Sequence, residues 1–107
     1  MTAIDKREML TWLYVKLNTV SSAIESTLKV LEKNEKASYG HQMAAIICFN
    51  SAIKYAKLNM PEIENAINSL SAAEMTEKEA KFLKSSIALK DSVVKTIEKY
   101  QSLNITI

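Results

Sequence analysis

The sequence is poor in the residues that make turns: its 107 positions include one glycine and one proline. Turns with positive φ angles draw first on glycine, so folds with many tight turns, such as β-sandwiches, barrels and glycine-rich phosphate loops, are excluded. The same scarcity removes most of the loops on which catalytic groups are usually carried. An all-α fold of long helices with few connections remains.

Cysteine and arginine are equally scarce, with one of each. Cys48 has no second thiol for a disulfide, which fits a reducing cytoplasm. Arg7 is the only side chain suited to planar, bidentate phosphate contacts. The longest apolar run, residues 43–49, is far shorter than the roughly 20 residues of a membrane-spanning helix, and no signal peptide is evident. We therefore expect one soluble, cytoplasmic domain over residues 1–107, with a net charge of +2.

The first third of the chain has the periodicity of one long helix. Apolar residues recur every three or four positions, which places them on a single face. This stripe consists of Leu10, Leu13, Leu17, Val20, Ile24, Leu28 and Leu31. Thr2 can cap the start of the helix, with Asp5 in its first turn. We predict a helix over residues 3–34.

A second helix is predicted to begin near residue 39, with Ser38 as its cap, after a polar turn. Pro61 could either end this helix or kink it. Counted at 100° per residue, the apolar faces before and after Pro61 differ by only about 30°, which favours one kinked helix over residues 39–72. A break at residues 59–61, which would produce a four-helix bundle, is the alternative.

Thr76 and Glu79 mark the clearest boundary, because Thr-x-x-Glu is the capping box that starts a helix. A third helix is predicted from there to about Leu103. Its apolar residues form two adjoining rows, which suit contact with two neighbours. The rows are Ala80, Leu83, Ile87, Val94 and Ile97, and Phe82, Leu89, Val93 and Tyr100. The sequence thus predicts an antiparallel up-down bundle of three long helices, the middle one kinked or broken near Pro61.

Candidate catalytic chemistry is sparse. His41 is the only histidine, and the His-x-x-Lys-Gly motif of histidine phosphotransfer domains is absent, because Ala44 and Ala45 stand where Lys and Gly are needed. We expect a structural or capping role for His41. Cys48 lies about 10 Å further along the helix, too far to share a metal ion, and is expected to be a buried small hydrophobic residue. We predict no catalytic residue, no metal site and no cofactor.

Apolar residues outside the predicted stripes are candidates for a partner surface. Met43 and Ile47 lie on the side of the second helix that later carries polar residues. Trp12 and Val15 lie about 120° or more from the leucine stripe of the first helix. Tryptophan and methionine are favoured at protein interfaces. The alternative is that these side chains face a second neighbour inside the bundle.

A row of lysines marks the polar side of the third helix. Its members, within about 60° of one another, are Lys81, Lys84, Lys95 and Lys99. Such a row could contact a polyanion. However, Asp91 interrupts it and no exposed aromatic residue is evidently interleaved, so a solvated surface is the simpler interpretation.

The sequence therefore predicts a small, non-enzymatic helical protein that binds another protein through a helix face, alone or as a homodimer. Adaptors, chaperones, inhibitors and immunity proteins of bacteria and phages include helical bundles of this size, a likeness of architecture that rests on no motif. Met43 and Ile47 would form the contact, with Trp12 and Val15 as a second patch. A nucleic-acid-associated protein that uses the lysine row is the alternative.

Overall fold

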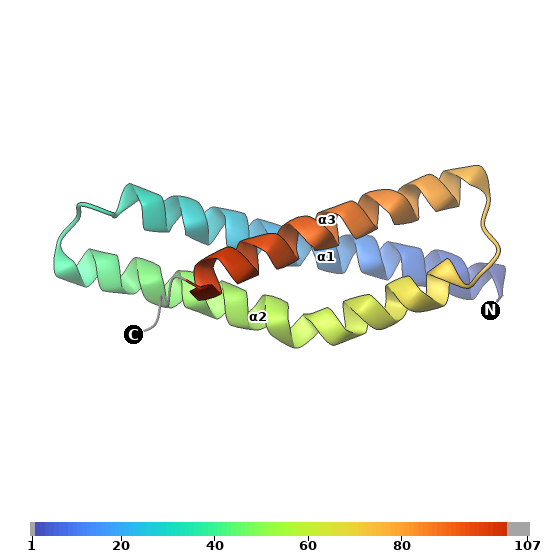
Figure 1. Cartoon of the computed structure of the whole chain (residues 1–107), viewed down its shortest axis with the longest axis horizontal. Helices are drawn as coiled ribbons and strands as arrows, with labels where there is room; N and C mark the ends of the chain where they lie inside the picture. The colour runs from blue at the N-terminus through green and yellow to red at the C-terminus, as the bar shows by residue number, and fades with distance from the viewer. Residues whose placement is uncertain (1, 103–107) are drawn as a thin grey trace.

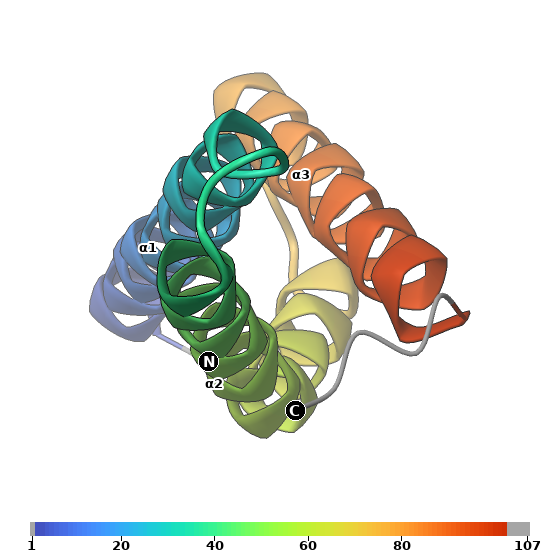
Figure 2. The ribbon, with the colours of Figure 1, turned by 90° about the vertical axis from the view of Figure 1, so that its left-hand side faces the viewer.

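The computed structural model of the protein describes residues 2–102, which form three helices and no strand (Figure 1). α1 spans Ala3–Lys33, α2 spans Tyr39–Ser71 and α3 spans Glu77–Ser102. They run up, down and up, in a bundle of 54 × 19 × 17 Å. Seen end on, the helices occupy the three corners of a triangle (Figure 2). The predicted antiparallel three-helix bundle is confirmed.

α2 continues through Pro61 without interruption, so the four-helix alternative is not observed. Proline has no N–H, and the Lys57 carbonyl therefore loses its usual helical donor. Pro61 and Lys57 are both exposed, so water can replace that hydrogen bond. A kink at Pro61 stays a prediction.

The core lies along the middle of the bundle and receives side chains from all three helices. From α1 it receives Leu10, Leu13, Leu17, Val20 and Ile24. From α2 it receives Ala45, Phe49, Ala52, Ala56, Ile63, Ala66, Ile67 and Leu70. Half of these α2 residues are alanines, whose small side chains let the leucines of α1 approach the α2 backbone closely. The α1–α2 contact is accordingly the most extensive in the bundle.

α3 crosses the other two helices obliquely. Its first turns lie beside α1, where the rings of Phe82 and Tyr14 are 5.3 Å apart. Its last turns lie beside α2, where the Tyr100 ring meets Phe49 edge-on at 4.9 Å (Figures 1 and 2). Because α3 moves from one neighbour to the other, no straight row of its residues stays buried along its whole length.

The two rows predicted for α3 are therefore only partly buried. Leu83, Val93 and Ile97 belong to the core, whereas Ala80 and Phe82 are exposed, contrary to the prediction. Ser86 of α3 is also buried, although it is polar. Its hydroxyl donates to the Phe82 carbonyl oxygen at 3.1 Å, so its burial leaves no unpaired donor.

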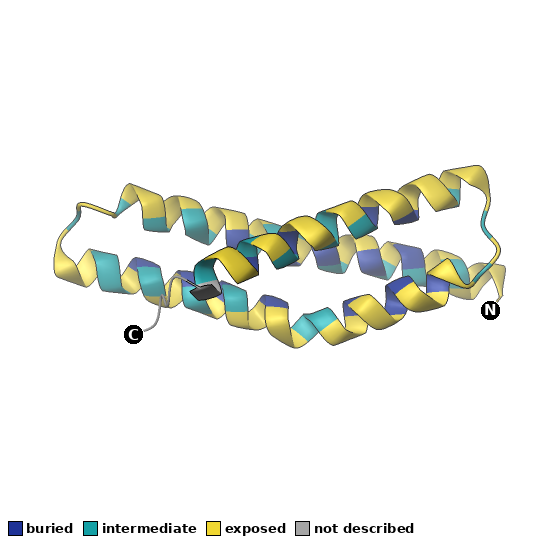
Figure 3. Ribbon diagram, in the orientation of Figure 1, coloured by how far each residue is buried: buried dark blue, intermediate teal, exposed yellow. Residues whose placement is uncertain are grey.

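The end of the bundle at the α1–α2 turn is thinly covered. No residue from Glu25 to Ala44 is buried, and Figure 3 shows this end coloured as exposed or intermediate. Leu28 and Leu31, the last two members of the predicted α1 stripe, are only partly buried there. α3 has 26 residues against 33 in α2, so it does not cover the full length of the α1–α2 pair.

The predicted capping box at Thr76 is present, and the predicted cap at Thr2 forms a second capping box with Asp5. Thr2 Oγ1 accepts from the Asp5 N–H at 3.1 Å, and the Asp5 carboxylate accepts from the Thr2 N–H at 3.4 Å. At the start of α3, Thr76 Oγ1 accepts from the Glu79 N–H at 3.2 Å, and Glu79 Oε1 accepts from the Thr76 N–H at 2.9 Å. These reciprocal bonds satisfy N–H groups that a helix start otherwise leaves without partners.

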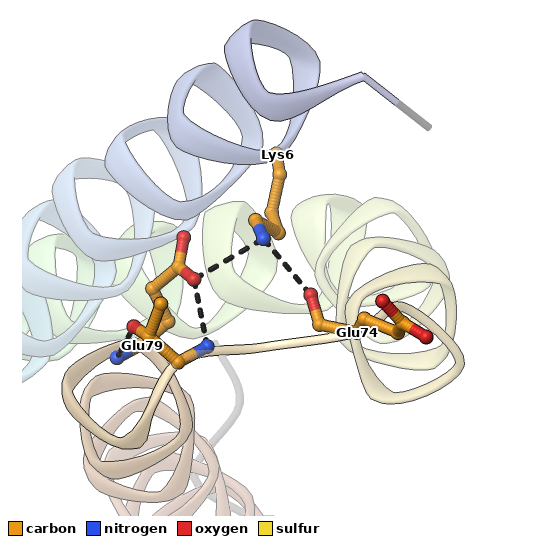
Figure 4. Close-up of polar contacts among 4 residues, drawn as sticks. Lys6, Glu74 and Glu79 are labelled. Atoms are coloured by element: carbon orange, nitrogen blue, oxygen red, sulfur yellow. Dashed lines mark hydrogen bonds and ion pairs between the residues drawn. The ribbon is translucent and has the colours of Figure 1, made fainter.

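Lys6 connects the second capping box to α1 (Figure 4). Its Nζ donates to the Glu74 carbonyl oxygen at 2.9 Å and lies 3.1 Å from Glu79 Oε1. Both charged side chains are only 18% exposed, so this ion pair is less screened than a surface pair. The hydrogen bonds from Thr76 and Lys6 hold the pKa of Glu79 below its ordinary value. The turn between α2 and α3 is thereby tied to the first turns of α1.

Replacement of Ala56 by leucine tests the close α1–α2 packing. Ala56 is fully buried, so the added carbons have no space, and we expect a loss of about 1–3 kcal/mol in the free energy of unfolding. The matched control is Ala44→Leu, at an exposed position of the same helix, where the change should stay within about 0.5 kcal/mol. Urea denaturation measures both values, and equal midpoints for the two variants would contradict the packing.

Glu79→Gln tests the tie through Lys6. The pKa of Glu79 in the folded protein is below the ordinary value of 4.5, so ionised Glu79 stabilises the fold at pH values above 4.5. This stabilisation disappears as the pH falls through the lowered pKa. Glutamine preserves the capping geometry and removes the charge. We expect a lower thermal midpoint than wild type at neutral pH, with the difference closing well below pH 4.5. A pH-independent difference would exclude the charged tie.

Candidate protein-binding surface

The side of the α1–α2 pair that faces away from α3 collects exposed apolar side chains. Tyr14 packs on α3, whereas Lys16, on nearly the opposite side of α1, places its Nζ 5.7 Å from the centre of the Tyr55 ring of α2. The Lys16–Tyr55 contact thus marks the seam between α1 and α2. Exposed or partly exposed residues within about 100° of Lys16 around the axis of α1, or of Tyr55 around the axis of α2, lie on this side. We give the name hairpin face to seven of them: Trp12, Val15, Thr19, Ile47, Cys48, Tyr55 and Leu58. Lys16, Ser51 and Lys54 lie among them.

The hairpin face carries few charges, with Lys16 at the seam and Lys54 at its edge. The exposed residues between Glu8 and Glu25 are all uncharged: Thr11, Tyr14, Val15, Thr19 and Ser22. On α2, residues 39–53 contain no Asp, Glu, Lys or Arg, although such residues make up 24% of the chain. Thr19 Oγ1 donates to the Val15 carbonyl oxygen at 2.8 Å, so a partner could cover this hydroxyl without stranding its donor.

Three of the four predicted partner-binding residues lie on this face. Val15 is 56% exposed and Ile47 is 50% exposed, whereas Trp12 is partly buried against the core with one side open. Met43 lies about 120° around α2 from Tyr55, outside the hairpin face, and is partly buried. Partner binding by any of the four stays a prediction.

Trp12 also lines an open groove of about 740 Å³ at one end of the hairpin face. The groove lies between the first turns of α1 and the last turns of α2. It is lined by Asp5, Glu8, Met9, Trp12, Glu62, Asn65, Ala66 and Ser69. We call it the Trp12 groove. It combines an aromatic ring and a thioether with three carboxylates.

The nearest cations of α1 are directed away from the Trp12 groove. Lys6 is held by Glu79 and the Glu74 carbonyl, and Lys16 lies over Tyr55. Within residues 2–102, Glu8 and Glu62 form no ion pair. The groove therefore keeps an uncompensated negative charge on a chain whose net charge is +2.

A second groove, of about 610 Å³, lies on the opposite side of α1 and was not predicted from the sequence. Leu10 and Phe82 line it together with Arg7, Lys78 and the Lys6–Glu79 pair. Phe82 is 38% exposed and stacks on Tyr14, which is 51% exposed. The periodicity of the third helix predicted Phe82 to lie in the core. The oblique course of α3 leaves it at the surface, and the hydrophobic pattern of one helix does not encode that course.

All four residues of the predicted lysine row are exposed on α3. Lys81 lies 3.7 Å from Glu77 in a highly exposed pair of little energetic weight, and Lys99 lies over the ring of Tyr100 at 5.3 Å. Lys84 and Lys95 complete the row. Nucleic-acid binding through this row stays a prediction.

Ser38 and Cys48 occupy different environments from those expected. Ser38 is the residue before α2, but its hydroxyl makes no capping bond to the backbone; it lies 2.8 Å from His41 Nδ1. The side-chain cap expected from Ser38 is therefore wrong, because the imidazole three residues later takes its hydroxyl. Cys48 is exposed, so its predicted burial is also wrong. It lies beside the seam, and α3 covers only the other side of α2.

Among the described residues, no three His, Cys, Asp or Glu side chains come together in a way that could hold a metal ion. None of the three helices has a stretch both long and apolar enough to cross a membrane. No protein-family model, curated protein or solved structure matches the chain. Its surfaces are consequently the basis on which a function can be argued.

The exposure of Cys48 can be tested by thiol labelling. We expect a maleimide to modify this single cysteine stoichiometrically in the folded protein, because an exposed thiol needs no unfolding to react. Mass spectrometry measures the extent of modification, and circular dichroism shows whether the labelled protein stays helical. Modification only in denaturant would place Cys48 in the interior.

Proposed function

We propose that the protein acts without catalysis, by binding another protein through the hairpin face. The observation that carries this proposal is the combination of exposed apolar residues and a low number of charges along the α1–α2 seam. Val15, Ile47 and Leu58 are each at least half exposed there, and Leu58 reaches 74%. Contiguous exposed apolar surface on a small protein is typical of an interaction site.

The fold supports a binding role because the face is built on rigid elements. Its residues stand on two long helices that are held together by a continuous core, so the surface is largely preformed. Docking then costs little conformational entropy in this chain. The partner is another protein or a second copy of this one, and the protein would act as an adaptor, chaperone, inhibitor or immunity-type protein, by covering a surface of its partner or by holding it.

The region of Met43 forms a second contact in this proposal. Met43 and Ile47 stand one helical turn apart on α2, near the thinly covered end of the bundle. A partner that lies along the hairpin face meets Ile47 first and reaches Met43 by extending around α2. Ile47 is therefore central to the contact, and Met43 belongs to its rim.

Site-specific photo-crosslinking in the native host tests the proposal. Benzoylphenylalanine is introduced at Val15 in one variant and at Ile47 in another. Both variants should crosslink to the same protein, because the two positions lie on one face. The matched control is Lys84, an exposed position of α3 away from this face, which should give no such product. Mass spectrometry identifies the product, and a product of twice the chain mass would identify a second copy as the partner.

Two results would contradict the proposal. One is crosslinking from Lys84 alone, which would move the contact to α3. The other is the absence of a defined product at Val15 and Ile47 in cells that contain the folded protein. Circular dichroism of each purified variant establishes that the fold is retained.

A further inference from the structure

We infer that the hairpin face binds a single amphipathic helix of a partner protein, and that a lysine or arginine at one end of that helix enters the Trp12 groove. This inference rests on the proposed function and adds the chemistry of the bound segment and the position of its charged end. It follows from the shape of the seam, from its apolar side chains and from the charge at its end.

The shape of the seam suits one helix. α3 already packs into one side of the α1–α2 pair, and the hairpin face is the equivalent side without a partner (Figure 2). A helix placed there would complete a four-helix arrangement, with α1 and α2 between two outer helices. Fifteen residues of α2 separate Ile47 from Glu62, a span of about 22 Å, which four turns of a helix cover.

The apolar side chains supply the anchors. Ile47, Tyr55 and Leu58 line one side of the seam, and Val15 and the open side of Trp12 line the other. An amphipathic helix presents apolar side chains every three or four residues, a spacing that alternates between the two sides of such a seam. The partner helix is thus expected to bury one apolar stripe here.

The charge at the end of the seam determines where the basic end of the partner helix lies. Asp5, Glu8 and Glu62 surround the Trp12 groove, while the seam around Ile47 has no charge to compensate. A guanidinium or ammonium group in the groove would pair with these carboxylates and lie near the indole ring, which attracts cations. Lys6 and Lys16 are engaged elsewhere and Arg7 lines the second groove, so a cation from the partner can pair with the carboxylates of the Trp12 groove.

A pair of designed peptides tests the inference, with Trp12 as the reporter because it is the only tryptophan in the chain. Both peptides are amphipathic helices of leucine, alanine and glutamine without tryptophan; one carries two arginines at one end and the other carries two glutamates there. We expect a saturable change in Trp12 fluorescence with the arginine peptide and at least tenfold weaker binding of the glutamate peptide.

A double variant, Glu8→Gln with Glu62→Gln, removes the charge from the groove at exposed positions. It should bind the arginine peptide at least tenfold more weakly than wild type. The matched control, Glu64→Gln with Glu98→Gln, removes two exposed carboxylates outside the groove and should bind as wild type does. A rising salt concentration should weaken the binding of the arginine peptide more than the binding of the glutamate peptide.

The outcomes separate this inference from the proposed function. If both peptides bind equally well and neither binds the Val15→Glu variant, the preference for a basic end is contradicted, whereas binding at the apolar face is retained. If neither peptide binds but Val15 and Ile47 still crosslink to a protein, the inference of a helical partner is contradicted and the proposed function is retained. Equal loss of affinity in the control and groove variants would also overturn the inference, because the effect would then reflect net charge.

Discussion

Close packing between the leucines of α1 and the alanine-rich side of α2 is the contact on which the rest of the structure depends. It brings the two longest helices together along most of their length, and α3 then adds to one side of the pair. Since α3 is short and crosses obliquely, it covers that side incompletely and leaves the other side open. The exposed seam at Tyr55 is therefore a direct consequence of how the core is built.

Most of the fold could be predicted from the sequence, because the relevant information is local. The stripe from Leu10 to Leu31, the cap at Thr2 and the capping box at Thr76 predicted helix boundaries that agree closely with the structure. The oblique course of α3 could not be predicted, because a hydrophobic pattern gives the faces of one helix and not the angle between two helices. Phe82 was misplaced for this reason, whereas Cys48 was misplaced because α3 covers only the other side of α2.

The candidate surface was harder to predict than the core. Trp12, Val15 and Ile47 could be found as apolar residues outside the stripes, but their relation to Tyr55 and Leu58 depends on how α1 is rotated against α2. The Trp12 groove joins Asp5 and Glu8 with Glu62, a residue more than fifty positions away in the sequence. The scarcity of charge between Glu8 and Glu25, where Lys16 is the only charged residue, was visible in the sequence and indicated an unusual surface.

The mixed composition of the hairpin face explains how it can stay open without a partner. A surface made only of large apolar residues would drive non-specific association, whereas Thr19 and Cys48 lower its hydrophobicity between the exposed side chains of Val15 and Ile47. The apolar contacts alone would then select a partner poorly, since many amphipathic helices could satisfy them. The carboxylates of the Trp12 groove add the discrimination that such a surface needs, because they favour a cationic end and repel an anionic one.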